Sequence, residues 1–262
     1  MKLNESNNLK YFRFQSFPQE KLNHGIFSRH GGVSPDSFCS LNVGESAGDS
    51  RENVLENRKR ILNVFDKPLS SIFDVWQIHS DVIVYTENPR PNGSKHTQAD
   101  AILTNSSNVS LFMQFADCVP ILVYDPKKNL IGIIHAGWQG TVKRIVKKTI
   151  LFMQEMFQSD PVDIIAGIGP SIGPDHYEVG KNVVIEIEEK LSDIKLDILL
   201  TENNKTYLDL WNANKLLLEI AGVTKIEISE ICTACNLKDW YSYRREGQKS
   251  GRFGVYFGFK YR

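Results

Sequence analysis

The sequence predicts a mixed α/β fold of the α+β class, in which helices flank a central mixed sheet. Two apolar patterns indicate this fold. Several runs have the length of buried strands: they are 109–115, 119–124, 130–134 and 164–168. Three longer segments have the length and composition of helices: they are 141–157, 181–192 and 209–221. No linker or low-complexity stretch separates these elements, so we expect residues 1–262 to form a single domain.

The N-terminal part of the chain adds one further helix and several strands. Residues 10–15 alternate in polarity, as a half-buried strand does. Asp49 or Ser50 is suited to capping a helix that runs to about Phe65. Shorter segments are expected as strands or as strand and turn: they are 72–78, 82–86 and 241–259.

Composition narrows the classes of function. Lysine plus arginine and aspartate plus glutamate both total 31, so the formal net charge is zero and the footprint of a nucleic-acid binder is missing. No apolar run approaches the ~20 residues of a membrane span. The N-terminus is polar, and four scattered cysteines do not make a disulfide framework. We therefore expect a cytoplasmic monomer with reduced cysteines and neither nucleic-acid nor membrane partners.

Three stretches carry residues with reactive side chains at the ends of predicted strands. His79 ends one strand, Asp117 and Cys118 lie between two apolar runs, and His135 stands at the mouth of a strand-to-helix turn. Strand ends and the loops beyond them are where α/β enzymes place reactive groups. These positions are therefore the first candidates for catalysis.

Two imidazoles and one thiolate, from His79, Cys118 and His135, suit a catalytic zinc that keeps its fourth position open. Asp117, next to Cys118, would orient a metal ligand or a water molecule. The separations of 39 and 17 residues are not those of a zinc finger. Taken singly, each residue also fits a structural role, as a hydrogen-bonded histidine or a small core cysteine.

The glycine turn after His135 suggests an anion site. A helix beginning near Thr141 would direct free N–H groups and its positive dipole end toward Gly137 and Gly140, which favours phosphate. Thr141 would act there as N-cap or as an anion ligand. The stretch lacks the lysine of a Walker motif.

Cys232 and Cys235 form a single Cys-Thr-Ala-Cys motif. One such pair without a second pair or a nearby histidine is weak evidence for a metal or redox site. We therefore expect a structural role for both cysteines.

Ordered motifs along nearly the whole chain closely resemble the laccase-domain family, whose members are also described as polyphenol oxidases and peptidoglycan editing factors. The chain departs from the usual family residues at Ser80, Gln139 and the pair Asp175–His176. The matching segments are 27–34, 40–44, 77–79, 99–104, 116–120, 135–138, 169–174, 177–179 and 242–247.

The resemblance implies a metal enzyme with His79, Cys118 and His135 as ligands, zinc as the metal and copper as an alternative. It implies phosphorolysis of adenosine, inosine, guanosine and methylthioadenosine, and also adenosine deamination. Purine nucleosides and phosphate would be the substrates, and residues 1–262 one catalytic domain. Further positions are implied to bind substrate: Ser28, Arg29 and Asn42 in the pocket, and Arg244 as an anion clamp.

Three other functions remain open at this point. A Cys–His hydrolase would use Cys118 as nucleophile and His135 or His79 as base, acting on cell-wall peptides or amides without a metal. A copper oxidase of phenols is disfavoured because only Met113 comes near Cys118, whereas blue-copper sites recruit a methionine. A non-catalytic binding module would not need the reactive residues at the strand ends.

Overall fold

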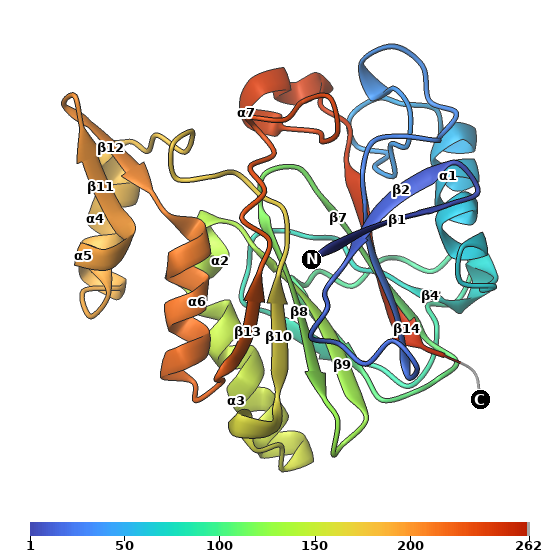
Figure 1. Ribbon diagram of the computed structural model, residues 1–262, viewed down its shortest axis with the longest axis horizontal. Coiled ribbons are helices and arrows are strands. Elements are labelled where there is room, and N and C mark those ends of the chain that lie inside the picture. The colour runs from blue at the N-terminus through green and yellow to red at the C-terminus, as the bar shows by residue number, and fades with distance from the viewer. Residues whose placement is uncertain (261–262) are drawn as a thin grey trace.

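The strands form two six-stranded mixed sheets and one hairpin in the computed structural model, which describes residues 1–260 (Figure 1). The first sheet has the order β1 (Lys2–Ser6), β2 (Leu9–Arg13), β3 (Leu22–Phe27), β14 (Phe253–Phe259), β7 (Ser110–Phe115) and β4 (Ile72–Phe73). The second has the order β13 (Lys225–Ile228), β10 (Ile165–Ile168), β8 (Val119–Asp125), β9 (Leu130–Ala136), β6 (Ala101–Thr104) and β5 (Ile83–Tyr85). The hairpin joins β11 (Leu199–Glu202) to β12 (Lys205–Leu208).

Helices cover the outer faces of both sheets. In Figure 1, α3 and α6 lie beside the second sheet, whereas α1 lies on the opposite side of the molecule, against the first. The helices are α1 (Arg51–Asn63), α2 (Trp138–Val142), α3 (Ile145–Phe157), α4 (Lys181–Lys190), α5 (Lys195–Ile198), α6 (Leu210–Ile220) and α7 (Tyr243–Glu246). The side chain of Ser50 accepts a hydrogen bond from the backbone N–H of Asn53, so the predicted cap of α1 is confirmed.

Alternate side chains of the central strands enter different cores, which gives four layers in the order helix, sheet, sheet, helix. On β8, Ile121 packs with α3 and α6, whereas Leu122 faces the other sheet. On β7, Met113 lies between the sheets, whereas Phe112 packs with α1. Strands buried on both faces read as continuous apolar runs, because each face is covered.

The mixed α/β class predicted from the sequence is therefore confirmed, although its strands divide between two sheets instead of forming one central sheet. Two predicted elements have the wrong bounds. The strand expected over residues 72–78 is only the two-residue β4, which ends at Phe73. The helix expected to start near Thr141 starts at Trp138, and a left-handed backbone at Arg144 (φ 59°) divides it into α2 and α3. Gly137, not Thr141, is the N-cap.

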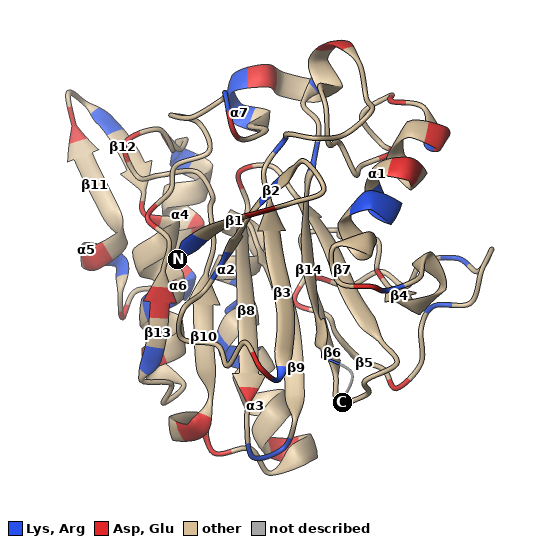
Figure 2. Ribbon diagram, turned by 45° about the vertical axis from the view of Figure 1, so that its right-hand side comes forward, with Lys and Arg blue, Asp and Glu red and all other residues tan. Residues whose placement is uncertain are grey.

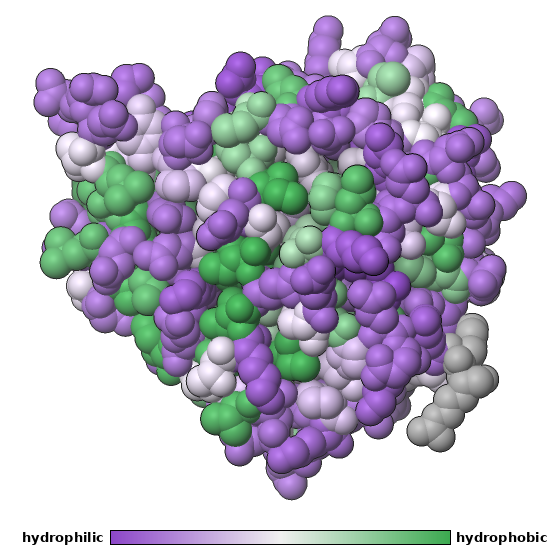
Figure 3. All heavy atoms as spheres, in the orientation of Figure 1, coloured by the Kyte–Doolittle hydropathy of each residue, from purple (hydrophilic) through white to green (hydrophobic). Residues whose placement is uncertain are grey.

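The surface is mixed in charge and polarity. Figure 2 shows acidic and basic residues interspersed along the chain, and in Figure 3 hydrophobic side chains occur in small groups between hydrophilic ones. None of the helices in residues 1–260 has the length and apolar character needed to cross a membrane.

Candidate active site

His79, Cys118 and His135 come together where the two sheets meet. Cys118 lies in the short turn that takes the chain from β7 of one sheet to β8 of the other, and His135 is near the end of β9. His79 lies in the loop after β4. One potential ligand atom from each of the three lies within 4.8 Å of the other two. The rings of the two histidines are 4.9 Å apart.

A fourth residue, Asp100, organises both histidines. Its fully buried carboxylate lies 2.8 Å from Nδ1 of His135 and accepts hydrogen bonds from the backbone N–H groups of residues 78–80. The hydroxyl of Ser80 donates to the same carboxylate. A carboxylate on one ring nitrogen fixes the imidazole and leaves the other nitrogen, Nε2 of His135, for a metal.

Cys118, His135 and Asp100 have pKa values that depend on their neighbours in the site. Burial alone would raise the pKa of Cys118, but His135 and His79 beside the thiol lower it to about 6. Burial likewise opposes the charged form of His135, but Cys118 and Asp100 raise its pKa to about 9. Burial would raise the pKa of Asp100, yet its hydrogen bonds with His135 and Ser80 lower it to about 2. The thiolate, the form that binds metals, is therefore favoured at neutral pH.

Gly137 borders the cluster at the start of α2. A methyl group there would place its carbon 2.8 Å from Sγ of Cys118 and 3.0 Å from Nδ1 of His79. A side chain at this position would therefore press on two of the three donors. Only glycine leaves the space between them free.

A cavity of about 560 Å³ opens beside the three residues. Ala116 and Gln114 contribute to its wall, together with the cluster itself. Its other lining residues include four aromatic side chains and two arginines: Trp76, Trp138, Tyr177, Tyr243, Arg244 and Arg252. This volume and this mixture of rings and a few polar groups are typical of small-molecule sites.

Asp117 lines the cavity but makes contacts different from those expected. Its carboxylate accepts hydrogen bonds from the hydroxyls of Thr233 and Ser242 and from the backbone N–H of Arg244. Burial raises the pKa of Asp117. The residue thus holds the start of α7 against the cavity, and the carboxylate that orients a histidine is that of Asp100.

Arg244 and Arg252 bring positive charge to the cavity wall. Arg244 donates to the carbonyl oxygens of His176 and Glu178 and lies over the ring of Tyr177, 4.9 Å from its centre. Arg252 donates to the carbonyls of residues 250 and 251. Within residues 1–260, neither guanidinium forms an ion pair with a carboxylate, so both charges are available to an anion.

The structure does not bring three of the predicted substrate-binding residues to this cavity. Ser28 is buried and donates to the carbonyl of Lys10. The Arg29 guanidinium is occupied by four backbone carbonyls and by Glu246. Asn42 is fully buried, and its side-chain oxygen accepts from the backbone N–H of Arg252. These residues support the loops around the cavity.

The phosphate site predicted at Thr141 is not formed in the structure. Thr141 is buried inside α2, and its hydroxyl is hydrogen-bonded to Asn214. The backbone N–H of Thr141 donates to the carbonyl of Gly137, so it is not free for an anion. Gly137 itself remains at the site, next to the metal donors.

Three residues of the site were not predicted from the sequence: Asp100, Tyr177 and Arg252. Asp100 could have been identified, because it lies in a matching segment and is an acidic residue at the start of an apolar strand. Tyr177 also lies in a matching segment, whereas Arg252 lies outside all of them. The expectation that Cys232 and Cys235 lack metal partners is wrong, because Asp175 and His176 lie beside them.

The donor set fits a metal. Two imidazoles and a thiolate are the ligands that zinc and other borderline-soft divalent ions prefer, and three protein ligands leave a coordination position for substrate or water. The carboxylate of Asp100 beside Nδ1 of His135 adds the second-sphere support that metal-binding histidines usually have.

Comparison with known proteins places the chain among relatives of the same size. Residues 23–260 match the family described as multi-copper polyphenol oxidoreductase laccase. The chain is 37% identical to "Purine nucleoside phosphorylase YlmD" of Bacillus subtilis (strain 168), over 90% of this chain and 88% of that one. It is 33% identical to "Purine nucleoside phosphorylase" of Bacteroides thetaiotaomicron, over 88% of this chain and 89% of the relative.

Solved structures agree with this placement. The crystal structure of YlmD from Geobacillus stearothermophilus matches with a TM-score of 0.89 and 31% identity, over 98% of both chains. The Bacillus licheniformis hypothetical protein YfiH also matches with a TM-score of 0.89, at 30% identity, over 98% of this chain and 99% of that one. The chain belongs to the multi-copper polyphenol oxidoreductase laccase family, together with these YlmD and YfiH proteins.

Proposed function

We propose that this protein is a zinc-dependent purine nucleoside phosphorylase in which the whole chain acts as one catalytic domain. The observation that carries the proposal is the cluster of His79, Cys118 and His135 on the wall of a 560 Å³ cavity that also presents aromatic rings and two guanidinium groups. The names of the relatives from Bacillus subtilis and Bacteroides thetaiotaomicron support the same reaction.

The three residues of the cluster are the proposed ligands, through Nε2 in the case of His135. Zinc bound there would supply Lewis-acid chemistry to a substrate group or to water in the remaining coordination position. Zinc is preferred over copper because the cluster lacks a methionine: Met113 is buried in the core between the sheets.

The aromatic residues are suited to the purine. Trp76 and Tyr243 are each about half exposed at the mouth of the cavity, and Trp138 and Tyr177 line it as well. Flat rings at a wet surface bind a nucleobase by stacking, and stacking accepts different purines equally well. The proposed substrates are therefore adenosine, inosine, guanosine and methylthioadenosine.

The two arginines are suited to phosphate. A guanidinium presents paired N–H donors that match phosphate oxygens. Arg244 and Arg252 retain unpaired charge at the cavity wall, and Asp117 and Asn42 hold their backbones in place. Arg244 thus keeps the anion-binding role expected from the sequence, and Arg252 joins it.

In the proposed reaction a phosphate oxygen forms a bond with the anomeric carbon of the ribose as the bond from that carbon to the purine nitrogen breaks. The purine leaves with the electron pair and takes up a proton, which gives free base and ribose 1-phosphate. Arg244 and Arg252 hold the phosphate, and the aromatic residues hold the base. Adenosine deamination, in which water replaces the amino group and ammonia leaves, is proposed as a second activity of the same cavity.

A second candidate function also has geometric support. Cys118 contacts His135, and His135 contacts Asp100, as a nucleophilic cysteine, its base and an orienting acid do in a catalytic triad. The pKa of the thiol is lowered to about 6. This arrangement would allow a metal-free hydrolase acting on amides of the cell wall. The second histidine beside the same thiol favours the metal site, because a nucleophile needs one base.

The test is to incubate metal-replete protein with inosine, with and without phosphate, and to separate the products. The proposal predicts hypoxanthine and ribose 1-phosphate in equal amounts, only with phosphate. Cys118→Ala should remove this activity, whereas Cys39→Ala, which changes an exposed cysteine elsewhere, should keep it. Hypoxanthine release without phosphate dependence would contradict the proposal.

A further inference from the structure

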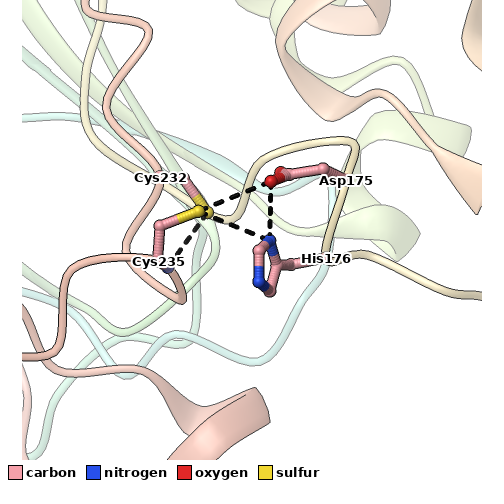
Figure 4. A group of neighbouring side chains, drawn as sticks. All are labelled: Asp175, His176, Cys232 and Cys235. Carbon is pink, nitrogen blue, oxygen red and sulfur yellow. Dashed lines mark hydrogen bonds and ion pairs between the residues drawn. The ribbon is translucent and has the colours of Figure 1, made fainter.

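A second group of metal-ligating side chains lies outside the cluster of His79, Cys118 and His135. Asp175 and His176 lie in the turn after β10, and Cys232 and Cys235 in the turn after β13. The two segments run side by side, joined by a bridge between Ser171 and Cys232. Figure 4 shows the four side chains pointing toward one another.

The four side chains lie close enough together to surround one ion. All four potential ligand atoms lie within 4.8 Å of one another. Sγ of Cys235 lies 3.4 Å from Nδ1 of His176 and 3.5 Å from Oδ2 of Asp175. Ligands bound about 2.0–2.3 Å from a tetrahedral zinc lie about 3.3–3.8 Å from each other. Sγ of Cys235 is therefore already at the spacing of a co-ligand, whereas Nδ1 of His176 and Oδ2 of Asp175 form an ion pair at 2.8 Å that a bound ion would part.

Two backbone N–H groups point at the sulfur of Cys232. Its Sγ accepts hydrogen bonds from the backbone N–H groups of Gly173, at 3.2 Å, and of Cys235, at 3.4 Å. These contacts hold the sulfur in place between the two turns. A side chain at Gly173 would lie 2.7 Å from Oδ1 of Asp175 and 3.1 Å from Cβ of Cys232, so glycine allows the two turns to approach.

We propose that Asp175, His176, Cys232 and Cys235 form a second metal site, which binds Zn²⁺. Two thiolates, one imidazole and one carboxylate complete a tetrahedral set, and a closed set of four protein ligands is typical of structural zinc. Among residues 1–260, Asp175 forms an ion pair with His176 and with no lysine or arginine. A divalent cation would balance the negative charge of these four ligands.

The site would act on the cavity through the turn that it fastens. Tyr177, the residue after the ligand His176, lines the cavity. The carbonyl oxygens of His176 and Glu178 hold the guanidinium of Arg244. A metal that clamps this turn to residues 232–235 would therefore fix one wall of the cavity. The proposal does not depend on the reaction proposed above, because metal content tests it directly.

The experiment counts zinc per chain by elemental analysis after reconstitution with excess Zn²⁺ under reducing conditions and removal of unbound metal. Wild-type protein should hold two ions. Cys118→Ala should hold one, and so should the double variant Cys232→Ser/Cys235→Ser. Cys39→Ser, which alters an exposed cysteine outside both clusters, should still hold two.

A second readout does not require the double variant to fold. Cobalt bound to Cys118→Ala protein should give the absorption of a tetrahedral ion with two thiolate ligands, and Asp175→Asn in the same background should weaken its binding at least tenfold. Cys118→Ala protein that holds no metal, or a folded double serine variant that still holds two ions, would overturn the proposal. A Cys232–Cys235 disulfide that persists under the reducing conditions would also overturn it.

Discussion

Nδ1 of His135 lies 2.8 Å from Oδ1 of Asp100, and the same carboxylate accepts the backbone N–H of His79. One buried acid therefore holds in place the imidazole ring of one proposed metal ligand, His135, and the backbone of another, His79. This contact links the residue before β6 to the end of β9 and to the loop after β4. It explains how residues far apart in the sequence converge on one point.

Asp100→Asn tests this relationship. The amide cannot stabilise the positive charge that His135 acquires, and its NH₂ group opposes some of the backbone donors around it. Loss of such an outer-sphere partner typically lowers metal affinity 10–100-fold. We expect a loss of this size for zinc at the His79–Cys118–His135 cluster, measured by competition with a chelating dye in the Cys232→Ser/Cys235→Ser background.

Asp193→Asn is the control, because it removes an acid from a surface ion pair with Arg144. It should leave zinc affinity unchanged. Thermal unfolding of both variants would separate a local loss of affinity from a loss of fold. An Asp100→Asn protein that folds and binds zinc as tightly as wild type would refute the role assigned to Asp100.

Gly137→Ala should damage the same cluster from the opposite side. Its new carbon would lie 2.8 Å from Sγ of Cys118, so the thiol or the helix start must move. We expect at least a tenfold loss of zinc affinity in the same competition assay. Gly140→Ala is the matched control in the same helix, because the nearest atom to its new carbon is 3.3 Å away, on Ile145. Equal zinc affinity in the two variants would contradict this account.

The protonation of Cys118 can be followed in metal-free protein. Because its pKa is lowered to about 6, the thiolate should persist through neutral pH and disappear as the pH falls below about 6. The rate of alkylation by iodoacetamide at Cys118, resolved by mass spectrometry, should therefore be half-maximal near pH 6. An ordinary thiol peptide reaches this point near pH ~8.5.

His135→Asn should move this midpoint upward, since it removes the largest influence that lowers the pKa of Cys118. A midpoint for wild-type Cys118 that coincides with that of the reference peptide would show that the histidines do not stabilise the thiolate.

Arg244→Ala tests the phosphate site. It should raise the KM for phosphate in inosine phosphorolysis about tenfold or more, because a charge-assisted contact of ~1.5–3 kcal/mol is lost. Zinc content should not change. Adenosine deamination, which uses water, should be affected much less. Arg245→Ala, one residue further along the exposed helix α7, is the matched control and should leave the KM for phosphate unchanged.

Arg29→Ala should behave differently from Arg244→Ala. Arg29 is held by Glu246 and by backbone carbonyls, so its removal should lower the melting temperature without a selective change in the KM for phosphate. Equal losses of phosphorolysis and deamination in Arg244→Ala would contradict the prediction for Arg244, and would assign it to nucleoside binding or to the fold.

The sequence was informative where chemistry and local pattern coincide. Three residues with metal-binding side chains were predicted at strand ends: His79, Cys118 and His135. The structure brings them into one cluster. The continuous apolar runs predicted buried strands, but such runs do not reveal which of two sheets a strand joins. That division depends on pairing between distant segments, as between β3 and β14.

Other parts of the site depend on contacts that local pattern does not encode. The helix after His135 begins three residues before Thr141 because the extended backbone of Gly137 caps it. The partners of Cys232 and Cys235 come from another turn, brought close by the parallel pairing of β10 and β13. Arg29 looked available in a glycine-rich loop, but three of its partners lie more than 200 residues away, at Leu237, Trp240 and Glu246.

The central claim is that zinc at His79, Cys118 and His135 supports phosphorolysis of purine nucleosides. The most direct measurement is the phosphate-dependent release of hypoxanthine from inosine by chelator-treated Cys232→Ser/Cys235→Ser protein as zinc is returned in steps. We expect activity to be lost on chelation and to return in proportion to zinc, reaching its maximum at one ion per chain. Chelated protein that keeps full activity with no bound metal would contradict the account.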